Sequence, residues 1–288
     1  MADMYIVVTP ARNEAEHIEA TIASMLSQTI TPHLWIIVDD GSTDETAAIV
    51  ERITETIDWV QLVKRADRGH RSAGTGVMAA FGDGLDRVGN LDWAYLVKLD
   101  ADLRFDEDYF ERCLDAFEAD PNLGIAGGKI YDVYDDKLVH DPHPEFHVRG
   151  ATKIYRRACW EDIDGLIEAP GWDTLDEVKA NQKGWTTRTL SECPIYQLRP
   201  TGKAAGTWSN WSKNGAAAYR SGYHPAFVLA RAARRLVQPP SVTAPTALIY
   251  GYTKARWAKI ERIDDPELLR YVHEQQWNRL TGRESMWK

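Results

Sequence analysis

The stretch Tyr95-Leu96-Val97-Lys98-Leu99-Asp100-Ala101-Asp102 decides the fold class of this 288-residue chain. Its apolar first part is typical of a buried strand, and the strand stops in two carboxylates two residues apart. Similar short runs occur earlier, at residues 5–9, 34–38 and 60–63. They alternate with stretches of helical length, a pattern that predicts βαβ units and an α/β fold with a mostly parallel sheet.

The stretches between these strands have helical periodicity. Residues 14–28 and 73–85 each place apolar side chains at helical intervals. Asn13 with Glu16, and Ser42 with Glu45, have the spacing of a capping box. We therefore expect helices to begin at both of these pairs.

Three of the predicted strands end in polar residues. These ends are Thr9-Pro10, Asp39-Asp40-Gly41 and Asp100-Ala101-Asp102. In a parallel sheet such ends lie at one edge, where ligands bind in α/β proteins. The coincidence predicts a binding site at that edge.

The acidic residues at this edge suit a nucleotide diphosphate and its cation. Asp100 and Asp102 can hold Mg²⁺ or Mn²⁺ through oxygen ligands, and the cation would bridge phosphates. An exposed carboxylate of Asp40 can accept the imide N–H of a uracil. The alternatives are a plain acidic turn at residues 100–102 and a strand–turn–helix without a ligand at residues 38–44.

The ordered motifs resemble those of family 2 glycosyltransferases with the GT-A fold. The matching segments are Thr9-Pro10-Ala11-Arg12-Asn13-Glu14, Val38-Asp39-Asp40-Gly41-Ser42-Thr43-Asp44 and Leu99-Asp100-Ala101-Asp102. The resemblance covers roughly residues 4–200. It implies an inverting enzyme that uses a nucleotide-sugar donor, with a metal at its leaving group.

The resemblance also implies roles for single residues. It places Thr9 and Asp40 at the base, Asp100 at the ribose and Asp102 at the metal. It also implies a basic residue near the nucleotide, for which Arg71 and Arg68 are candidates unless this is only a solvated basic loop. The residues expected to bind the nucleotide are therefore Thr9, Pro10, Arg12, Glu14, Asp40, Arg68, Arg71 and Asp100.

An inverting transfer to a hydroxyl needs a carboxylate base on the acceptor side. The family usually has a Glu-Asp pair ahead of a helix that ends in Gly and an aromatic residue, here Gly184-Trp185. Counting back from Gly184 gives Asp173 as the base, with Trp172 replacing the usual Glu. Asp176 is the alternative base, and both aspartates can instead have only a helix-capping role. Arg149 is expected on the acceptor side, where Trp172 can stack on a sugar unless it is core.

The C-terminal part differs from the rest in charge. The chain as a whole has a net charge of −9, which gives it no reason to bind nucleic acid. Residues 199–262 nevertheless contain eleven basic residues and one acidic residue. Amphipathic, tryptophan-bearing cationic segments favour an anionic membrane surface, although the helices can instead pack on the catalytic domain with their arginines in water.

These observations predict a division of the chain. We expect a GT-A domain at residues 1–200, with a nucleotide-binding half (1–102) and an acceptor half (103–200). A mostly helical basic extension should follow at residues 201–288. No signal peptide and no window of 18 apolar residues is found, so we expect a cytoplasmic protein, peripheral at the inner face of the membrane if the extension docks there.

The expected reaction is inverting transfer of a sugar, most simply from a UDP-sugar, to a hydroxyl of a glycan or lipid-linked acceptor. One alternative is a polyprenyl-phosphate sugar synthase, whose ionised phosphate acceptor needs no base. Another is a catalytically silent nucleotide-sugar-binding or membrane-docked scaffold protein. The presence of Asp100, Asp102 and Asp173 argues against the silent protein.

Overall fold

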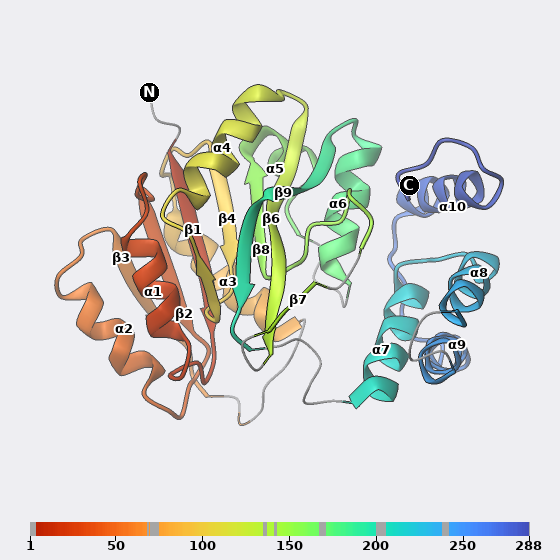
Figure 1. Ribbon diagram of the computed structural model, residues 1–288, viewed down its shortest axis with the longest axis horizontal. Coiled ribbons are helices and arrows are strands. Elements are labelled where there is room, and N and C mark those ends of the chain that lie inside the picture. The colour runs from red at the N-terminus through yellow and green to blue at the C-terminus, as the bar shows by residue number, and fades with distance from the viewer. Residues whose placement is uncertain are drawn as a thin grey trace.

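The structure is a computed structural model that describes residues 4–67, 69, 75–134, 137–140, 143–166, 171–199, 206–237 and 242–287. These residues form a nine-stranded sheet in the order β3-β2-β1-β4-β8-β6-β9-β5, and β7 pairs with β6. Helices cover both faces of the sheet, and a group of helices lies beyond one end (Figure 1). The architecture is mixed α/β with a helical C-terminal part, as predicted.

The first half of the chain is the parallel part of the sheet. Its strands are β1 (Tyr5–Ala11), β2 (Leu34–Asp39), β3 (Val60–Lys64) and β4 (Tyr95–Leu99), which are all parallel to one another. The connecting helices are α1 (Ile18–Leu26), α2 (Thr46–Thr54) and α3 (Thr75–Val88). Every residue of β2 and β4 is buried, which explains their continuous apolar sequence.

The second half adds mostly antiparallel strands beside β4. They are β5 (Leu103–Phe105), β6 (Leu123–Tyr134), β7 (Lys137–Val139), β8 (Thr152–Arg156) and β9 (Thr186–Gln197). The helices of this half are α4 (Tyr109–Ala119), α5 (Arg157–Asp162) and α6 (Trp172–Gln182). The strand β8 runs antiparallel to both β4 and β6, so it ends the parallel region next to the acidic end of β4.

Two hydrophobic clusters fill the two faces of the sheet. Alternate residues of β1 divide between them, since Tyr5 and Val7 join the cluster under α1 and α4, while Ile6 and Val8 join the cluster under α3. This alternation is the period of two that strands impose on side-chain direction. The carboxyl edge of the strands is thereby left for polar residues.

The C-terminal part consists of α7 (Gly206–Arg220), α8 (Pro225–Arg235), α9 (Thr243–Trp257) and α10 (Pro266–Leu280). These helices share a third hydrophobic cluster, which also includes Phe146 and Val178 of the preceding part. The extension therefore packs on the α6 side of the molecule (Figure 1). The boundary at residue 200 stays a prediction, because residues 200–205 lie outside the described ranges.

The two predicted capping boxes are wrong. The first helix begins at Ile18 and the second at Thr46, and neither N-cap has a side-chain hydrogen bond. Asn13 instead has a positive φ of 54° and its Oδ1 accepts a hydrogen bond from the Thr43 N–H at 2.8 Å. The Asn13 N–H in turn donates to Ser42 Oγ at 2.9 Å. The capping-type side chains join two loops at the carboxyl edge of the sheet rather than starting helices.

Candidate active site

The polar strand ends predicted from the sequence do lie along one edge of the sheet. Because β2, β1 and β4 are adjacent in that order, Asp40 stands on one side of the β1 end and Asp100 on the other. The backbone confirms the closeness, since the Asp40 N–H donates to the Ala11 carbonyl at 2.8 Å. The Asp100 N–H donates to Ala151 on the far side of β4, also at 2.8 Å.

Asp102 is the most unusual carboxylate at this edge. It is 6% exposed, and its Oδ1 has no hydrogen-bond partner among the described residues. Its Oδ2 has one long contact, with Gln197 Nε2 at 3.4 Å. Burial, reinforced by the neighbouring Asp100 carboxylate, raises the pKa of Asp102 to about 7. A buried oxygen with this environment fits a hard cation, which takes one or two carboxylates and leaves its other positions to phosphate and water.

Asp100 is held by a buried lysine. Lys98, which is 2% exposed, forms an ion pair with Asp100 and also donates to the Gly150 carbonyl. Its ammonium group lies 5.6 Å from the centre of the Trp172 ring. One side chain therefore connects the acidic end of β4 to the start of α6, where the proposed base lies.

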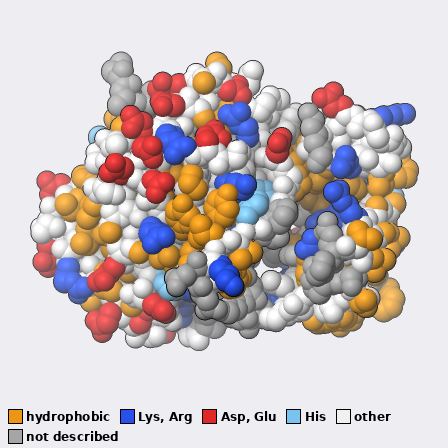
Figure 2. Space-filling view, viewed as in Figure 1, with side chains coloured by type: hydrophobic (Ala, Val, Ile, Leu, Met, Phe, Trp, Pro, Cys, Tyr) orange, Lys and Arg blue, Asp and Glu red, His pale blue; other side chains and the backbone are white. Residues whose placement is uncertain are grey.

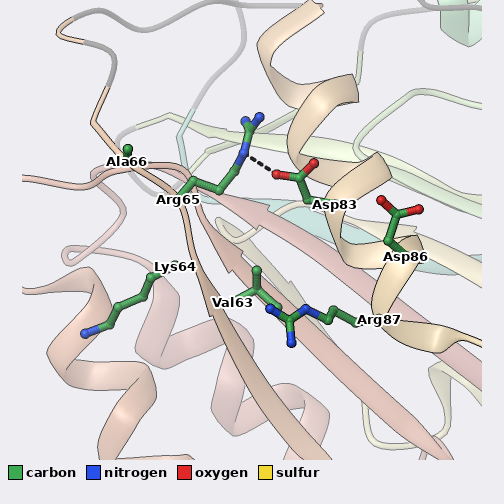
Figure 3. A pocket seen from close by; sticks show the side chains of 7 residues that line it. All are labelled: Val63, Lys64, Arg65, Ala66, Asp83, Asp86 and Arg87. Atoms are coloured by element: carbon green, nitrogen blue, oxygen red, sulfur yellow. Dashed lines mark ion pairs between the residues drawn. The ribbon is translucent and has the colours of Figure 1, made fainter.

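Asp40 lies at the predicted edge, but its carboxylate is not exposed as expected. The residue is 6% exposed, and its Oδ1 is paired with Arg65 Nη1 at 2.6 Å. Arg65 also pairs with Asp83 of α3 at 2.6 Å, beside a hollow of about 360 Å³ that Figure 3 shows. The reason is the parallel sheet, which places the end of β3 directly beside the end of β2.

Arg12 links the loop after β1 to the loops after β2 and β3. Its Nη1 donates to the Asp40 carbonyl, and its Nη2 pairs with Asp67 at 2.7 Å. Glu14 is 6% exposed and forms an ion pair with Arg199, which follows β9. Arg12 and Glu14 thus hold together the loops that follow β1, β2, β3 and β9.

Thr9 and Pro10 lie at the end of β1. The Thr9 side chain is fully buried, and its hydroxyl accepts a hydrogen bond from the Trp35 indole N–H at 2.9 Å. Its hydroxyl is therefore used inside the sheet. Arg68 and Arg71, the two candidate basic residues near the nucleotide, lie outside the described residues.

Asp173 is brought to the acidic end of β4 through Gly150. A Cβ added at Gly150 would lie 3.2 Å from Asp173 Cβ and 3.0 Å from the Trp172 ring, so a larger residue would push Trp172 and Asp173 away by a few tenths of an ångström. Asp173 is partly exposed in the first turn of α6. Trp172 is 7% exposed and lies between the ammonium groups of Lys98 and Lys153, both within 5.6 Å of its ring. Its ring belongs to this packing rather than to an open surface.

Asp176, the alternative base, lies in a sealed ion cluster. It is 1% exposed, and both of its oxygens accept from Lys153 Nζ, at 2.8 and 2.9 Å. Tyr155 donates its hydroxyl to Asp176 Oδ2 at 2.6 Å. Burial raises the pKa of Asp176 to about 6, against the opposing effect of Lys153. With its lone pairs occupied, Asp176 serves to position α6.

Glu177 and His147 complete this cluster. Glu177 pairs with Lys153 at 2.8 Å and with His147 Nδ1 at 2.9 Å. Burial opposes charge on both Lys153 and His147, but the neighbouring carboxylates outweigh it, and the pKa of each is raised. The start of α6 is therefore fixed by charged groups from β8 and from the loop before it.

Arg149, which the sequence predicts on the acceptor side, is linked to Asp102 through Gln197. Its Nη2 donates to Gln197 Oε1 at 3.1 Å, and Gln197 in turn contacts Asp102. A second contact joins Arg149 to Asp132 at 3.7 Å. An arginine predicted from the acceptor strand is thus connected to the predicted metal carboxylate through one amide.

Several residues of this site were missed by the sequence analysis. They are Arg65, Lys98, Lys153, Glu177 and Gln197. Arg65 could have been noticed from the sequence, since it comes shortly after the strand predicted at residues 60–63, and consecutive strands of an α/β fold are often neighbours. Lys98 and Lys153 could also have been noticed, because a lysine inside an otherwise apolar strand needs a partner.

Among the described residues, no group of three or more His, Cys, Asp or Glu side chains could hold a metal.

Comparison with known proteins identifies the family. The sequence profile of glycosyl transferase family 2 matches residues 6–170, more than half of the chain. The chain belongs to glycosyl transferase family 2. Family membership makes it a glycosyltransferase by class, as its motifs predicted, and the profile spans the acidic strand ends described above.

Curated relatives of this family 2 chain are polysaccharide synthases. Poly-beta-1,6-N-acetyl-D-glucosamine synthase of Staphylococcus aureus (strain COL) is 32% identical over 116 residues. The enzyme of the same name from Staphylococcus epidermidis is 28% identical over 116 residues. Each match covers 40% of this chain and 26% of the relative, so the chain matches about a quarter of the relatives' length.

Solved structures share the GT-A fold of the family. The mannosyltransferase PcManGT from Pyrobaculum calidifontis, in complex with GDP-Man and Mn²⁺, has a TM-score of 0.58 at 17% identity, covering 99% of this chain and 77% of that one. S. aureus TarS 1–349 in complex with UDP has a TM-score of 0.55 at 15% identity, covering 97% of this chain and 92% of that one. Such likeness confirms the predicted fold and its helical C-terminal part.

The helices were also compared with the length of a membrane span. Within the described residues, none is both long and apolar enough to cross a bilayer.

Proposed function

We propose that this family 2 glycosyltransferase transfers a sugar with inversion from a UDP-sugar to a hydroxyl of a glycan or lipid-linked acceptor. The observation that carries the proposal is the buried Oδ1 of Asp102, which has no hydrogen-bond partner within the described part of the chain. It lies at the edge that also holds Asp40 and, through Gly150, Asp173. One structural neighbour, TarS, supports a UDP-linked donor, because it is named in complexes with UDP and UDP-GlcNAc, whereas PcManGT is named in a complex with GDP-Man. UDP-GlcNAc is therefore the first donor to test.

The donor would lie across the carboxyl ends of β2, β1 and β4. Asp40, which is held by Arg65, would contact the base, and Asp100, on the other side of β1, would contact the ribose. Mg²⁺ or Mn²⁺ would be held by Asp102 and Asp100, where it would neutralise charge on the diphosphate leaving group.

Asp173 would accept the proton of the attacking hydroxyl. It is the partly exposed carboxylate of α6, while Asp176 is enclosed by Lys153 and Tyr155. A base must come within hydrogen-bond reach of its proton, so accessibility favours Asp173. The two carboxylates have separate roles, with Asp173 taking the proton and Asp176 holding the helix.

The helical extension would bring this site to a membrane surface. Among the described residues, nine of the thirteen large hydrophobic side chains with the greatest exposure lie between Trp208 and Leu280. Figure 2 shows hydrophobic side chains along the edge formed by these helices, with Lys and Arg side chains nearby. Exposed hydrophobic and cationic groups together favour an anionic surface, which suits a lipid-linked acceptor.

The test is a comparison of donor binding by the wild type, Asp102→Asn and the control Asp58→Asn, an exposed aspartate remote from the sheet edge. Melting temperatures would be measured with UDP-, GDP- and dTDP-sugars, with and without Mn²⁺. We expect a UDP-sugar to raise the melting temperature of the wild type and the control only with Mn²⁺, and Asp102→Asn to lose that rise. Without ligand, Asp102→Asn should be more stable by about 1 kcal/mol, because a buried charge is removed. A metal-dependent rise that persists in Asp102→Asn would contradict the proposal.

A further inference from the structure

A second hollow lies in the helical extension, away from the sheet edge. Its volume is about 320 Å³, within the range of small-molecule sites. Its walls come from the end of α7, from α9 and α10, and from the loops before α8 and α10. The side chains that line it include Tyr219, Tyr223, Tyr252, Arg256, Arg262 and His273.

Two arginines at this hollow have no acidic partner. Neither Arg256 nor Arg262 forms an ion pair with a carboxylate within the part of the chain that the structure describes. Both are exposed, and the Arg262 guanidinium lies 5.6 Å from the centre of the Tyr219 ring. Burial raises the pKa of Tyr252, and the two guanidinium groups oppose that rise, which places both of them near its hydroxyl.

The floor of the hollow is rigid and aromatic. Tyr252 donates its hydroxyl to the Tyr223 carbonyl at 2.8 Å, and its ring meets the Tyr219 ring edge-on at 5.6 Å. His273 Nε2 lies 2.7 Å from the Gly222 carbonyl. The tyrosines are thereby held in place before any ligand arrives, while the guanidinium donors remain available.

The hollow also lies close behind the proposed base. Ser221, between Tyr219 and Tyr223 in the chain, has its Oγ 3.3 Å from the position of a Cβ added at Gly171. Gly171 is the N-cap of α6 and precedes Asp173 by two residues. A group bound in this hollow would therefore lie near the start of α6, the helix that carries Asp173.

We propose that this hollow binds a phosphate ester carried by the acceptor, with Arg256 and Arg262 as the donors to the phosphate oxygens. Guanidinium groups suit phosphate because they donate two hydrogen bonds in the plane of the charge. The tyrosine rings would contact the sugar or polyol carbons attached to it. A recessed hollow of this size fits a single ester group rather than a flat bilayer. That the phosphate ester belongs to the acceptor rests on the proposed function, but phosphate binding by the hollow does not depend on it.

The experiment measures binding of glycerol 3-phosphate by calorimetry in the presence of saturating UDP and Mn²⁺, which occupy the donor site. The test variants are Arg256→Ala/Arg262→Ala and the single charge reversal Arg256→Glu. The control is Arg234→Ala/Lys254→Ala, which removes the same charge from other exposed positions of the extension. We expect affinity to fall about tenfold or more in both test variants and less than about threefold in the control.

Two results would overturn the proposal. One is an equal loss in the control, which would mean general attraction by the basic extension. The other is an unchanged affinity of the test variants for glycerol 3-phosphate together with weaker binding to phosphatidylglycerol vesicles. That result would assign the arginines to a lipid surface. Binding of UDP and Mn²⁺ is measured separately, and its failure would count against the proposed function. A titration of glycerol 3-phosphate without UDP would still test the hollow in that case.

Discussion

Asp173 and Asp176 lie three residues apart on α6 but have opposite surroundings. Asp173 is partly exposed beside Gly150, whereas Asp176 is enclosed by Lys153 and Tyr155. Helical spacing alone would place them near one face, so spacing could not separate their roles. The separation comes from Lys153, a lysine of β8 that takes Asp176 out of reach of a substrate.

This difference predicts opposite results for two matched substitutions. Asp173→Asn should change the free energy of unfolding by less than about 1 kcal/mol but lower hydrolysis of the bound donor about 10²–10⁴-fold, because general-base catalysis is lost. Asp176→Asn should cost about 3 kcal/mol, since it leaves Lys153 without its main partner. Urea unfolding and release of UDP from UDP-GlcNAc measure the two effects. Wild-type hydrolysis by Asp173→Asn would move the base elsewhere.

At the scale of elements, the position of α3 depends on one glycine. A Cβ added at Gly84 would lie 2.4 Å from Val8 Cγ1 and 3.0 Å from Val38 Cγ2. The helix therefore packs its backbone closely on β1 and β2, two of the strands that end at the polar edge. Gly82, in the same helix, has nothing within 4 Å of an added Cβ.

The two glycines offer a matched test of this packing. Gly82→Ala should stabilise the protein by about 0.5–1 kcal/mol, because alanine is the better helix former. Gly84→Ala should destabilise it by about 1–3 kcal/mol, because the added methyl group must push β1 and β2 away from α3. Urea unfolding of the two variants checks both signs. A stabilised Gly84→Ala would show that the helix is free to shift.

At the scale of the whole molecule, charge and exposed hydrophobic groups are separated along the chain. Residues 199–262 contain eleven basic residues and one acidic residue, whereas the rest of the chain has more acidic than basic residues. Of the large hydrophobic side chains that the structure describes, Trp257 and Val237 are the most exposed, at 85% and 84%. Both belong to the extension, so exposed hydrophobic side chains and an excess of positive charge occur in the same part of the molecule.

We expect the protein to sediment with vesicles that contain phosphatidylglycerol and not with phosphatidylcholine alone. Trp257→Ser/Val237→Ser should weaken this binding several-fold, since buried apolar area contributes beside charge. The control Leu138→Ser/Val139→Ser removes exposed apolar groups from β7, outside the extension, and should have little effect. Added salt should weaken binding as the charges are screened. Equal binding to both kinds of vesicle would contradict a charge-driven surface.

The four parallel strands, their order of appearance and the acidic edge at their carboxyl ends were readable from the sequence, whereas β5, β6, β7 and β9 were not. Buried parallel strands have continuous apolar runs, and residues that follow such strands must meet at one edge, so Asp40, Asp100 and Asp102 could be named without coordinates. Helix starts were less readable. Asn13 and Ser42 have the chemistry of a cap, but the same groups bind across two loops, and local spacing cannot distinguish these uses.

The sequence by itself therefore determined the fold class, the family and the acidic edge, because each depends on local patterns of polarity and on motifs in order. Only the tertiary structure decided which carboxylates are available. Lys153, Arg65 and Gly150 come from strands and loops distant in sequence, and they set the burial and pairing of Asp176, Asp40 and Asp173. The reason is physical, since desolvation and ion pairing depend on what surrounds a group in space, and neighbours along the chain supply only part of those surroundings.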